Sequence, residues 1–200
     1  MKKISIFNRI VFLFTGHLAG YKVVGGMQPY SELTTFYYTI AFGTLVLASI
    51  LLMLLGFEIL ESNGVLVVAA LIPVGLALGM VNQYLPQMHL YFLIISIAGI
   101  IAVAYSRFLM SQKAALIMLT LVHGIAGMVV VFIPLVLVLN GTLNTPAFLI
   151  SLGGIIISAE GILLASFKVG KTFIAPEKIY SSFPMVLFLA NLAFVAGMQN

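Results

Sequence analysis

Seven apolar runs, joined by brief polar connections, fill most of this 200-residue chain. Hydrophobic residues make up 62% of the sequence and charged residues only 7%, which is too apolar for a water-soluble domain. Most runs are close to the ~20 residues that a helix needs to cross ~30 Å of hydrocarbon. The sequence therefore predicts a polytopic, all-α transmembrane helical bundle with seven spans, in a single integral-membrane domain over residues 1–200. The expected spans are residues 4–24, 35–55, 65–84, 89–110, 114–139, 146–167 and 183–198.

The distribution of basic residues predicts the orientation. If the first run crosses the membrane, eight Lys and Arg residues fall on one side and only Lys22 on the other; if that run lies on the surface, the bias nearly vanishes. Lys and Arg in short loops mark the cytoplasmic side. We therefore expect a multi-pass protein of a cell inner membrane or plasma membrane, with its N-terminus inside and its C-terminus outside. The eight residues are Lys2, Lys3, Arg9, Arg107, Lys113, Lys168, Lys171 and Lys178.

An internal similarity links the even-numbered spans. The segment 95–101 (ISIAGII) recurs 55 positions later as 150–156 (ISLGGII). A two-helix unit used three times after an extra first helix is one interpretation, and chance similarity between apolar helices is the other. Helical repeats are common in transporters, where the binding site lies between them. Pro73 and Pro134 are expected to kink the third and fifth helices.

Two histidines lie within predicted spans, each beside glycines. His17 is near the middle of the first span and His123 is in the fifth. Two imidazoles that face each other at one depth are the ligands of a six-coordinate b-type haem. The alternative is that each ring hydrogen-bonds to an adjacent helix, because an unpaired polar group in hydrocarbon is costly. Haem b is thus one cofactor hypothesis, and no cofactor is the other.

Glu160 is the carboxylate that lies deepest in a span. An ionised side chain at that depth costs roughly 2.5–3.5 kcal/mol on insertion scales, so Glu160 should be buried, protonated or paired. Arg107, in the inner half of another even-numbered span, is the expected partner. We therefore expect a buried Glu160–Arg107 ion pair, with a proton site as the alternative.

Polar residues also gather where the first span ends and the second begins. They could line an outward cavity or form an ordinary belt at the level of the lipid headgroups. The members expected to form this outward polar cluster are Tyr21, Lys22, Glu32, Thr35 and Thr39.

Composition removes many enzyme classes. The chain has no Cys and no Asp, which excludes thiolate chemistry, iron–sulfur clusters, Cys-ligated zinc and aspartyl catalysis. HExxH and GxSxG motifs are also absent, and no catalytic residue or metal site is predicted. The leading hypothesis is a non-enzymatic membrane protein that is a subunit or packing partner of a larger membrane complex. The alternatives are a small-solute or ion transporter and a b-haem electron-transfer subunit. The expected partners are the lipid bilayer and other membrane subunits or a second copy of the chain, and not nucleic acid.

Overall fold

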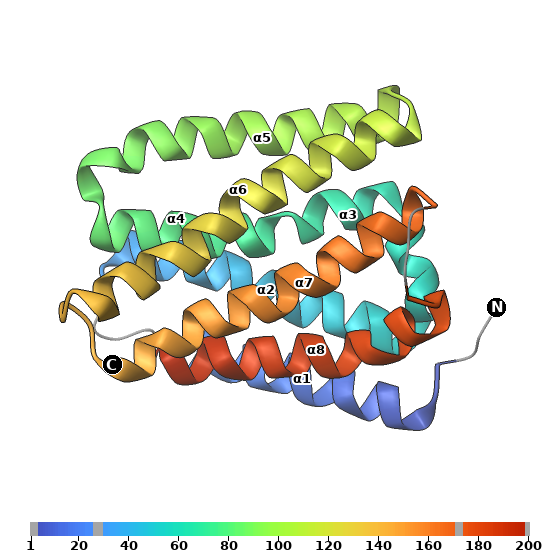
Figure 1. The fold of residues 1–200 in the computed structure, drawn as a ribbon, viewed down its shortest axis with the longest axis horizontal. Helices are drawn as coiled ribbons and strands as arrows, with labels where there is room; N and C mark the ends of the chain where they lie inside the picture. The colour runs from blue at the N-terminus through green and yellow to red at the C-terminus, as the bar shows by residue number, and fades with distance from the viewer. Residues whose placement is uncertain (1–3, 26–29, 171–173, 199–200) are drawn as a thin grey trace.

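A computed structural model describes residues 4–25, 30–170 and 174–198. Within these residues the protein is an all-α bundle without strands, whose helices run along one long axis (Figure 1), so the predicted fold class is confirmed. The α-helices are α1 (Ile6–Val24), α2 (Glu32–Leu55), α3 (Asn63–Ala69), α4 (Leu71–Tyr84), α5 (His89–Leu109), α6 (Gln112–Leu139), α7 (Phe148–Lys168) and α8 (Pro176–Gly197). Short 3-10 turns are η1 (Gly56–Glu61), η2 (Pro86–Met88) and η3 (Thr145–Ala147).

Among the described residues, six helical segments are long and apolar enough to cross a membrane. They account for every predicted span except the first, and α1 falls outside this set. The six are Glu32–Glu61, Asn63–Tyr84, Pro86–Leu109, Gln112–Leu139, Thr145–Lys168 and Pro176–Gly197.

The helix α1 nevertheless runs the full length of the bundle, side by side with α2 and α8 (Figure 1). Near one end, the Phe12 ring lies 6.1 Å from the Phe57 ring of η1. At the other end, the Lys22 Nζ donates a hydrogen bond of 2.8 Å to the Met198 carbonyl, just beyond α8. With α3 and α4 counted as one broken pass, the described chain therefore traverses the bundle seven times.

Proline positions explain where the helices differ from prediction. Pro73 has no N–H to donate into the preceding turn, and the third pass breaks at Ala70. Pro134 lies inside α6, which stays continuous. The last helix begins at Pro176, well before the predicted start at residue 183, because proline is well suited to the first helical position.

Glycines set how closely the helices approach. A Cβ placed on Gly79 of α4 would collide with the Tyr38 ring of α2, and one on Gly153 of α7 would lie 2.9 Å from the Ala190 carbonyl oxygen of α8. The repeated segments do not pack in the same way. Gly99 of α5 faces the helix that follows it in the chain, whereas its counterpart Gly154 faces the helix that precedes it. The three-fold repeat therefore stays a prediction from sequence.

The two ends of the bundle carry different kinds of side chain. The basic end holds the first turn of α1, η1, the α5–α6 turn and the ends of α7 and α8 that face their connecting loop (Figure 1). The described basic residues located there are Arg9, Arg107, Lys113, Lys168 and Lys178. The tyrosine end is the opposite one and holds Tyr30, Tyr38 and Tyr84. Lys2, Lys3 and Lys171 lie outside the described residues.

Candidate functional site

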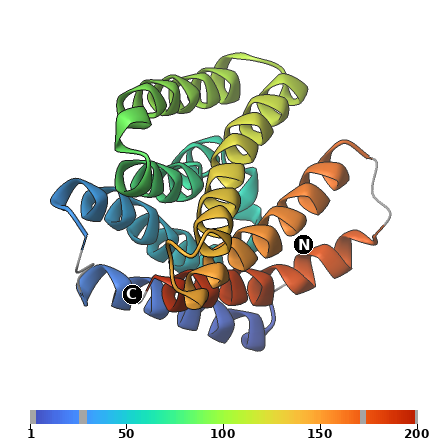
Figure 2. The same ribbon diagram turned by 60° about the vertical axis from the view of Figure 1, so that its left-hand side comes forward.

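The helix α1 lies at the edge of the bundle (Figure 2), and His17 is one of its exposed residues. Its side chain is exposed, and it forms no hydrogen bond with any described residue. The rest of this face consists of exposed apolar and aromatic side chains. We call it the α1 outer face, defined by Ile6, Ile10, Leu13, Phe14, His17 and Tyr21.

His123 is partly buried in α6, and its Nδ1 lies 3.1 Å from the Leu119 carbonyl oxygen of the same helix. The expectation that both histidines would bond to adjacent helices is thus wrong, because one ring bonds within its own helix and the other to no described residue. The structure also does not bring His17 and His123 together. The helix α1 packs on α2 and α8, whereas α6 packs on α4, α5 and α7. Haem binding remains an untested prediction, and this arrangement gives it no support.

Glu160 is buried between α7 and α8, with 4% of its surface exposed. Its Oε1 accepts a hydrogen bond of 3.2 Å from the Ser182 hydroxyl of α8. The expected Glu160–Arg107 ion pair is not formed, because Glu160 faces α8 while Arg107 lies on α5, which packs on α3, α4 and α6. A role for Glu160 as a proton site stays a prediction.

The Arg107 side chain projects from the last turn of α5. Its Nε and Nη2 are both buried, and neither has a hydrogen-bond partner among the described residues. Arg107 acts electrostatically on His123 and on Lys168, and Lys168 is in turn influenced by the carboxylate of Glu61. Arg107 is therefore a half-buried residue, two of whose donors are covered by the fold and lack an acceptor among the described residues.

The outward polar cluster is only partly assembled. Tyr21 and Glu32 are exposed, while Thr35 and Thr39 are half-buried and take part in no described hydrogen bond. Only Lys22 points inward, with 8% of its surface exposed. The helix phase explains the difference, because the inward face of α2 carries the neighbouring positions Thr34, Tyr37, Tyr38 and Ala41 at helical spacing.

Those inward residues build a hydrogen-bonded network at the tyrosine end. Residues from α1, α2, α4, the start of α5 and the loops take part. The bonds run from Lys22 Nζ and Tyr30 Oη to the Met198 carbonyl, from Tyr38 Oη to Gln83 Oε1, from Gln83 Nε2 to Tyr84 Oη, from Asn82 Nδ2 to Thr34 Oγ1, and between Tyr37 Oη and His89 Nε2. Burial raises the pKa of Tyr30, which lies in a loop, to about 12, and the nearby Tyr84 adds to the rise. The network closes this end rather than opening a polar cavity.

A second polar contact, deep in the bundle, was not predicted. The Asn191 Nδ2 of α8 donates a hydrogen bond of 2.9 Å to the Thr15 carbonyl of α1, and Asn191 is 1% exposed. Its Oδ1 and the Ser49 Oγ of α2 are buried without partners in the described chain. An Asn within an apolar run was the available sequence signal. The bond from Asn191 holds α8 against α1 at mid-depth.

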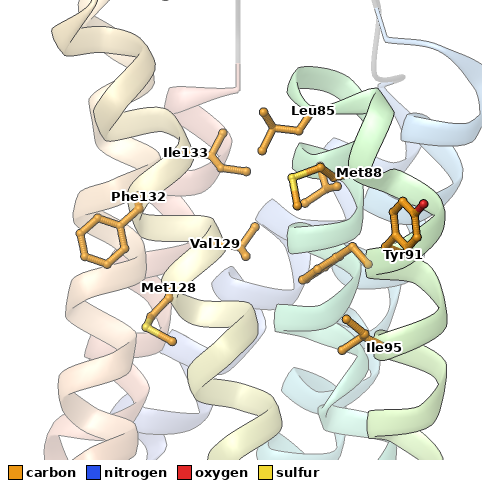
Figure 3. A pocket seen from close by; sticks show the side chains of 10 residues that line it. Leu85, Met88, Tyr91, Ile95, Met128, Val129, Phe132 and Ile133 are labelled. Carbon is orange, nitrogen blue, oxygen red and sulfur yellow. The ribbon is translucent and has the colours of Figure 1, made fainter.

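A pocket of about 360 Å³ opens between α4, α5 and α6, where α5 and α6 diverge (Figure 3). Its lining is apolar apart from one phenol group, so it offers no catalytic group. The lining residues are Val81, Leu85, Met88, Tyr91, Phe92, Ile95, Met128, Val129, Phe132 and Ile133.

No group of three or more His, Asp or Glu residues that could hold a metal ion occurs within residues 4–25, 30–170 and 174–198. The polar groups that the fold leaves without partners, above all His17 and Arg107, are therefore the candidate functional residues. Comparison of the chain with protein-family models, with curated proteins and with solved structures gives no match.

Proposed function

We propose that this protein is a non-enzymatic subunit of a larger membrane complex and that the α1 outer face is its binding surface. The observation that carries the proposal is the exposure of His17. It lies 11 residues from the start of α1, which is ~17 Å along the helix axis and close to the centre of a ~30 Å hydrocarbon layer.

Ionisable residues in transmembrane helices usually face the protein interior or a water-filled cavity. His17 instead faces outward from the bundle, among exposed residues such as Leu13 and Phe14. A free lipid-facing surface would leave the imidazole without a hydrogen-bond partner in hydrocarbon, which costs several kcal/mol. A transmembrane helix of a partner, with a polar group facing His17, removes that cost.

The low hydropathy of α1 supports the same conclusion. It is the pass that falls outside the six apolar spans, yet it sits at the edge of the bundle, far from the opposite edge formed by α5 (Figure 2). An edge helix that is poorly suited to lipid is well suited to a position between subunits. The cluster of basic residues at the basic end supports an orientation with that end, and the N-terminus, in the cytoplasm.

Cross-linking in the native membrane tests the proposal directly, because the chain has no cysteine and a single introduced thiol is unambiguous. Leu13→Cys places the thiol on the α1 outer face, where the side chain is 56% exposed. Leu121→Cys on α6 is the matched control, since the same residue type is 53% exposed there.

We expect a bifunctional thiol-to-amine or thiol-to-thiol reagent to shift Leu13→Cys to a discrete higher mass and to leave Leu121→Cys unshifted. A shift to twice the mass of the chain identifies the partner as a second copy, and any other discrete mass identifies a different subunit. Equal labelling of both variants, with no cross-linked product from Leu13→Cys, would contradict the proposal.

The transporter and haem hypotheses remain predictions without a supporting contact in the described residues. A visible absorption spectrum of the purified protein tests the haem hypothesis, because a bound b-type haem gives an intense Soret band.

A further inference from the structure

The exposed side chains of α1 follow the spacing of a coiled coil. Steps of four, three and four residues lead from Ile6 to His17, and Val24 lies one further heptad along. This spacing keeps one side of a helix turned toward a second helix along its whole length. We call these positions the α1 seam, and they are Ile6, Ile10, Leu13, His17 and Val24. The apolar members are between 46% and 87% exposed, so the described residues leave the seam uncovered.

A row of aromatic side chains repeats beside the α1 seam with the same period. Phe7, Phe14 and Tyr21 lie seven residues apart, and they are 61%, 56% and 61% exposed. A straight helix drifts by about 20° in each heptad, so a strict seven-residue repeat is typical of helices that pack in a left-handed coiled coil. A surface that faces only lipid needs no such repeat. The pattern therefore favours a second helix as the neighbour of α1.

Membrane topology restricts how a second copy of the chain can meet this seam. Two copies inserted with the same orientation, and related by a two-fold axis, share an axis along the membrane normal and use the same surface of each copy. Their α1 helices are then parallel, and each residue lies at the depth of its own counterpart. A second copy therefore places its own imidazole opposite His17, near the middle of the hydrocarbon layer.

An imidazole is complementary to another imidazole. A neutral ring carries one N–H donor and one nitrogen acceptor, so the ring of one copy can donate a hydrogen bond to the ring of the other. The opposite edge of the bundle has no such group at this depth. Ile97 of α5 lies 12 residues before the helix end, or ~18 Å from the basic end, and its exposed neighbours there are Ile94 and Ile101. A head-to-tail contact between α1 and α5 would leave His17 unpaired, whereas the two-fold contact satisfies it.

We propose that the partner at the α1 outer face is a second copy of this chain, packed along a parallel α1 seam with the two His17 rings hydrogen-bonded to each other. This inference rests on the proposed function, because it names the partner of the same surface. A single polar residue within an apolar seam fixes the register and the number of helices. His17 has that role here.

Oxidative cross-linking of the full chain in native membranes tests the seam, because the chain has no cysteine of its own. Leu13→Cys places a thiol on the α1 seam. Phe14→Cys is the matched control on the flank, since both native side chains are 56% exposed. A disulfide requires Cβ atoms about 3.5–4.5 Å apart, so we expect Leu13→Cys to form a disulfide-linked dimer about fivefold or more in excess of Phe14→Cys. Equal yields of dimer from the two variants would overturn the seam.

Co-expression of two copies that carry different affinity tags tests His17. We expect the second tag to co-purify with the first in mild detergent, and His17→Leu to reduce this co-purification by about fivefold or more. His17→Asn should retain it, because Asn also carries a donor and an acceptor. Unchanged co-purification in His17→Leu would overturn the histidine pair. A discrete complex that lacks the second tag would overturn the second copy and leave the proposed function intact, whereas the absence of any complex would contradict both.

Discussion

The tyrosine end and the basic end of the bundle satisfy their polar groups in different ways. At the tyrosine end, Lys22, Tyr30 and Tyr38 all bond to other parts of the same chain. At the basic end, Arg107 keeps two buried donors without an acceptor among the described residues, and Lys168 donates to the Leu60 carbonyl near Glu61. At the tyrosine end these polar groups find their hydrogen-bond partners within the chain, so they require no ligand or partner protein. The basic end instead keeps donors of Arg107 unsatisfied inside the fold.

Four glycines in the helices show a similar difference, although Gly20 and Gly141, also at the tyrosine end, have no close neighbour. At Gly79 and Gly197, near the tyrosine end, an added Cβ would collide with a neighbouring helix. At Gly64 and Gly161, toward the basic end, nothing lies within 4 Å of such a Cβ. At these four positions the neighbouring helices lie closer near the tyrosine end than toward the basic end.

Gly79→Ala should have the largest effect on stability, because its Cβ would collide with the Tyr38 ring in a part of the fold without free space. We expect a loss of about 1–3 kcal/mol, the usual cost of overpacking. Gly161→Ala is the matched control in open space and should be neutral or slightly stabilising, since Ala favours helix more than Gly. Unfolding followed by circular dichroism in detergent measures both. Equal losses in the free energy of unfolding for the two variants would contradict the difference in packing between the two ends.

Lys22→Met should have a smaller effect. The substitution keeps the apolar stem and removes one buried hydrogen bond, while the Met198 carbonyl keeps its bond from Tyr30. We expect a loss of about 1 kcal/mol in the free energy of unfolding. Lys113→Met at the basic end, where the side chain is exposed, should change stability by no more than about 0.5 kcal/mol. A larger loss for Lys113→Met than for Lys22→Met would reverse the comparison.

The pH dependence of Tyr30 should give the smallest effect. Its pKa is about 12 in the folded chain against 10.0 for a free phenol, so the folded chain keeps a proton that the unfolded chain loses. The stabilisation is therefore fully present below pH 10 and is lost as the pH rises from 10 to about 12. Tyr30→Phe should flatten the decline in stability over that window. The difference in tyrosinate absorbance between wild type and Tyr30→Phe follows this titration, because the chain contains no Trp and the other tyrosines are common to both. An unchanged decline in Tyr30→Phe would show that Tyr30 does not titrate in this way.

The fold was largely predictable because apolar length determines where helices lie in a membrane protein. Boundaries were less predictable. The last helix begins at Pro176 rather than at the predicted residue 183. The third pass is interrupted at Ala70, before Pro73, but it keeps its full length. Hydropathy alone does not place the first helix in the bundle. Its position depends on tertiary contacts such as the hydrogen bond from Asn191 to the Thr15 carbonyl.

The candidate sites were less predictable than the fold, because partners depend on helix phase and on which helices are neighbours. Glu160 and Arg107 lie in similar halves of their spans, yet their helices do not pack together. Thr35 and Tyr38 are three positions apart on one helix, and only Tyr38 points toward Gln83. The sequence identified polar residues whose burial in a membrane span is costly. It could not predict which of them would lack a hydrogen-bond partner in the folded chain.

Two of the three histidines allow a direct test of the central claim, that the α1 outer face binds a partner. His17 is exposed without a described partner, whereas His89 bonds to the Tyr37 hydroxyl at 2.8 Å within the fold. The measurement is the mass of the complex after mild detergent extraction, together with the melting temperature of the isolated chain, for His17→Leu and His89→Leu. We predict that His17→Leu loses the complex and keeps or raises the melting temperature, because leucine suits lipid better than histidine. His89→Leu should keep the complex and lower the melting temperature. A His17→Leu variant that keeps the complex at full mass would contradict the proposed function.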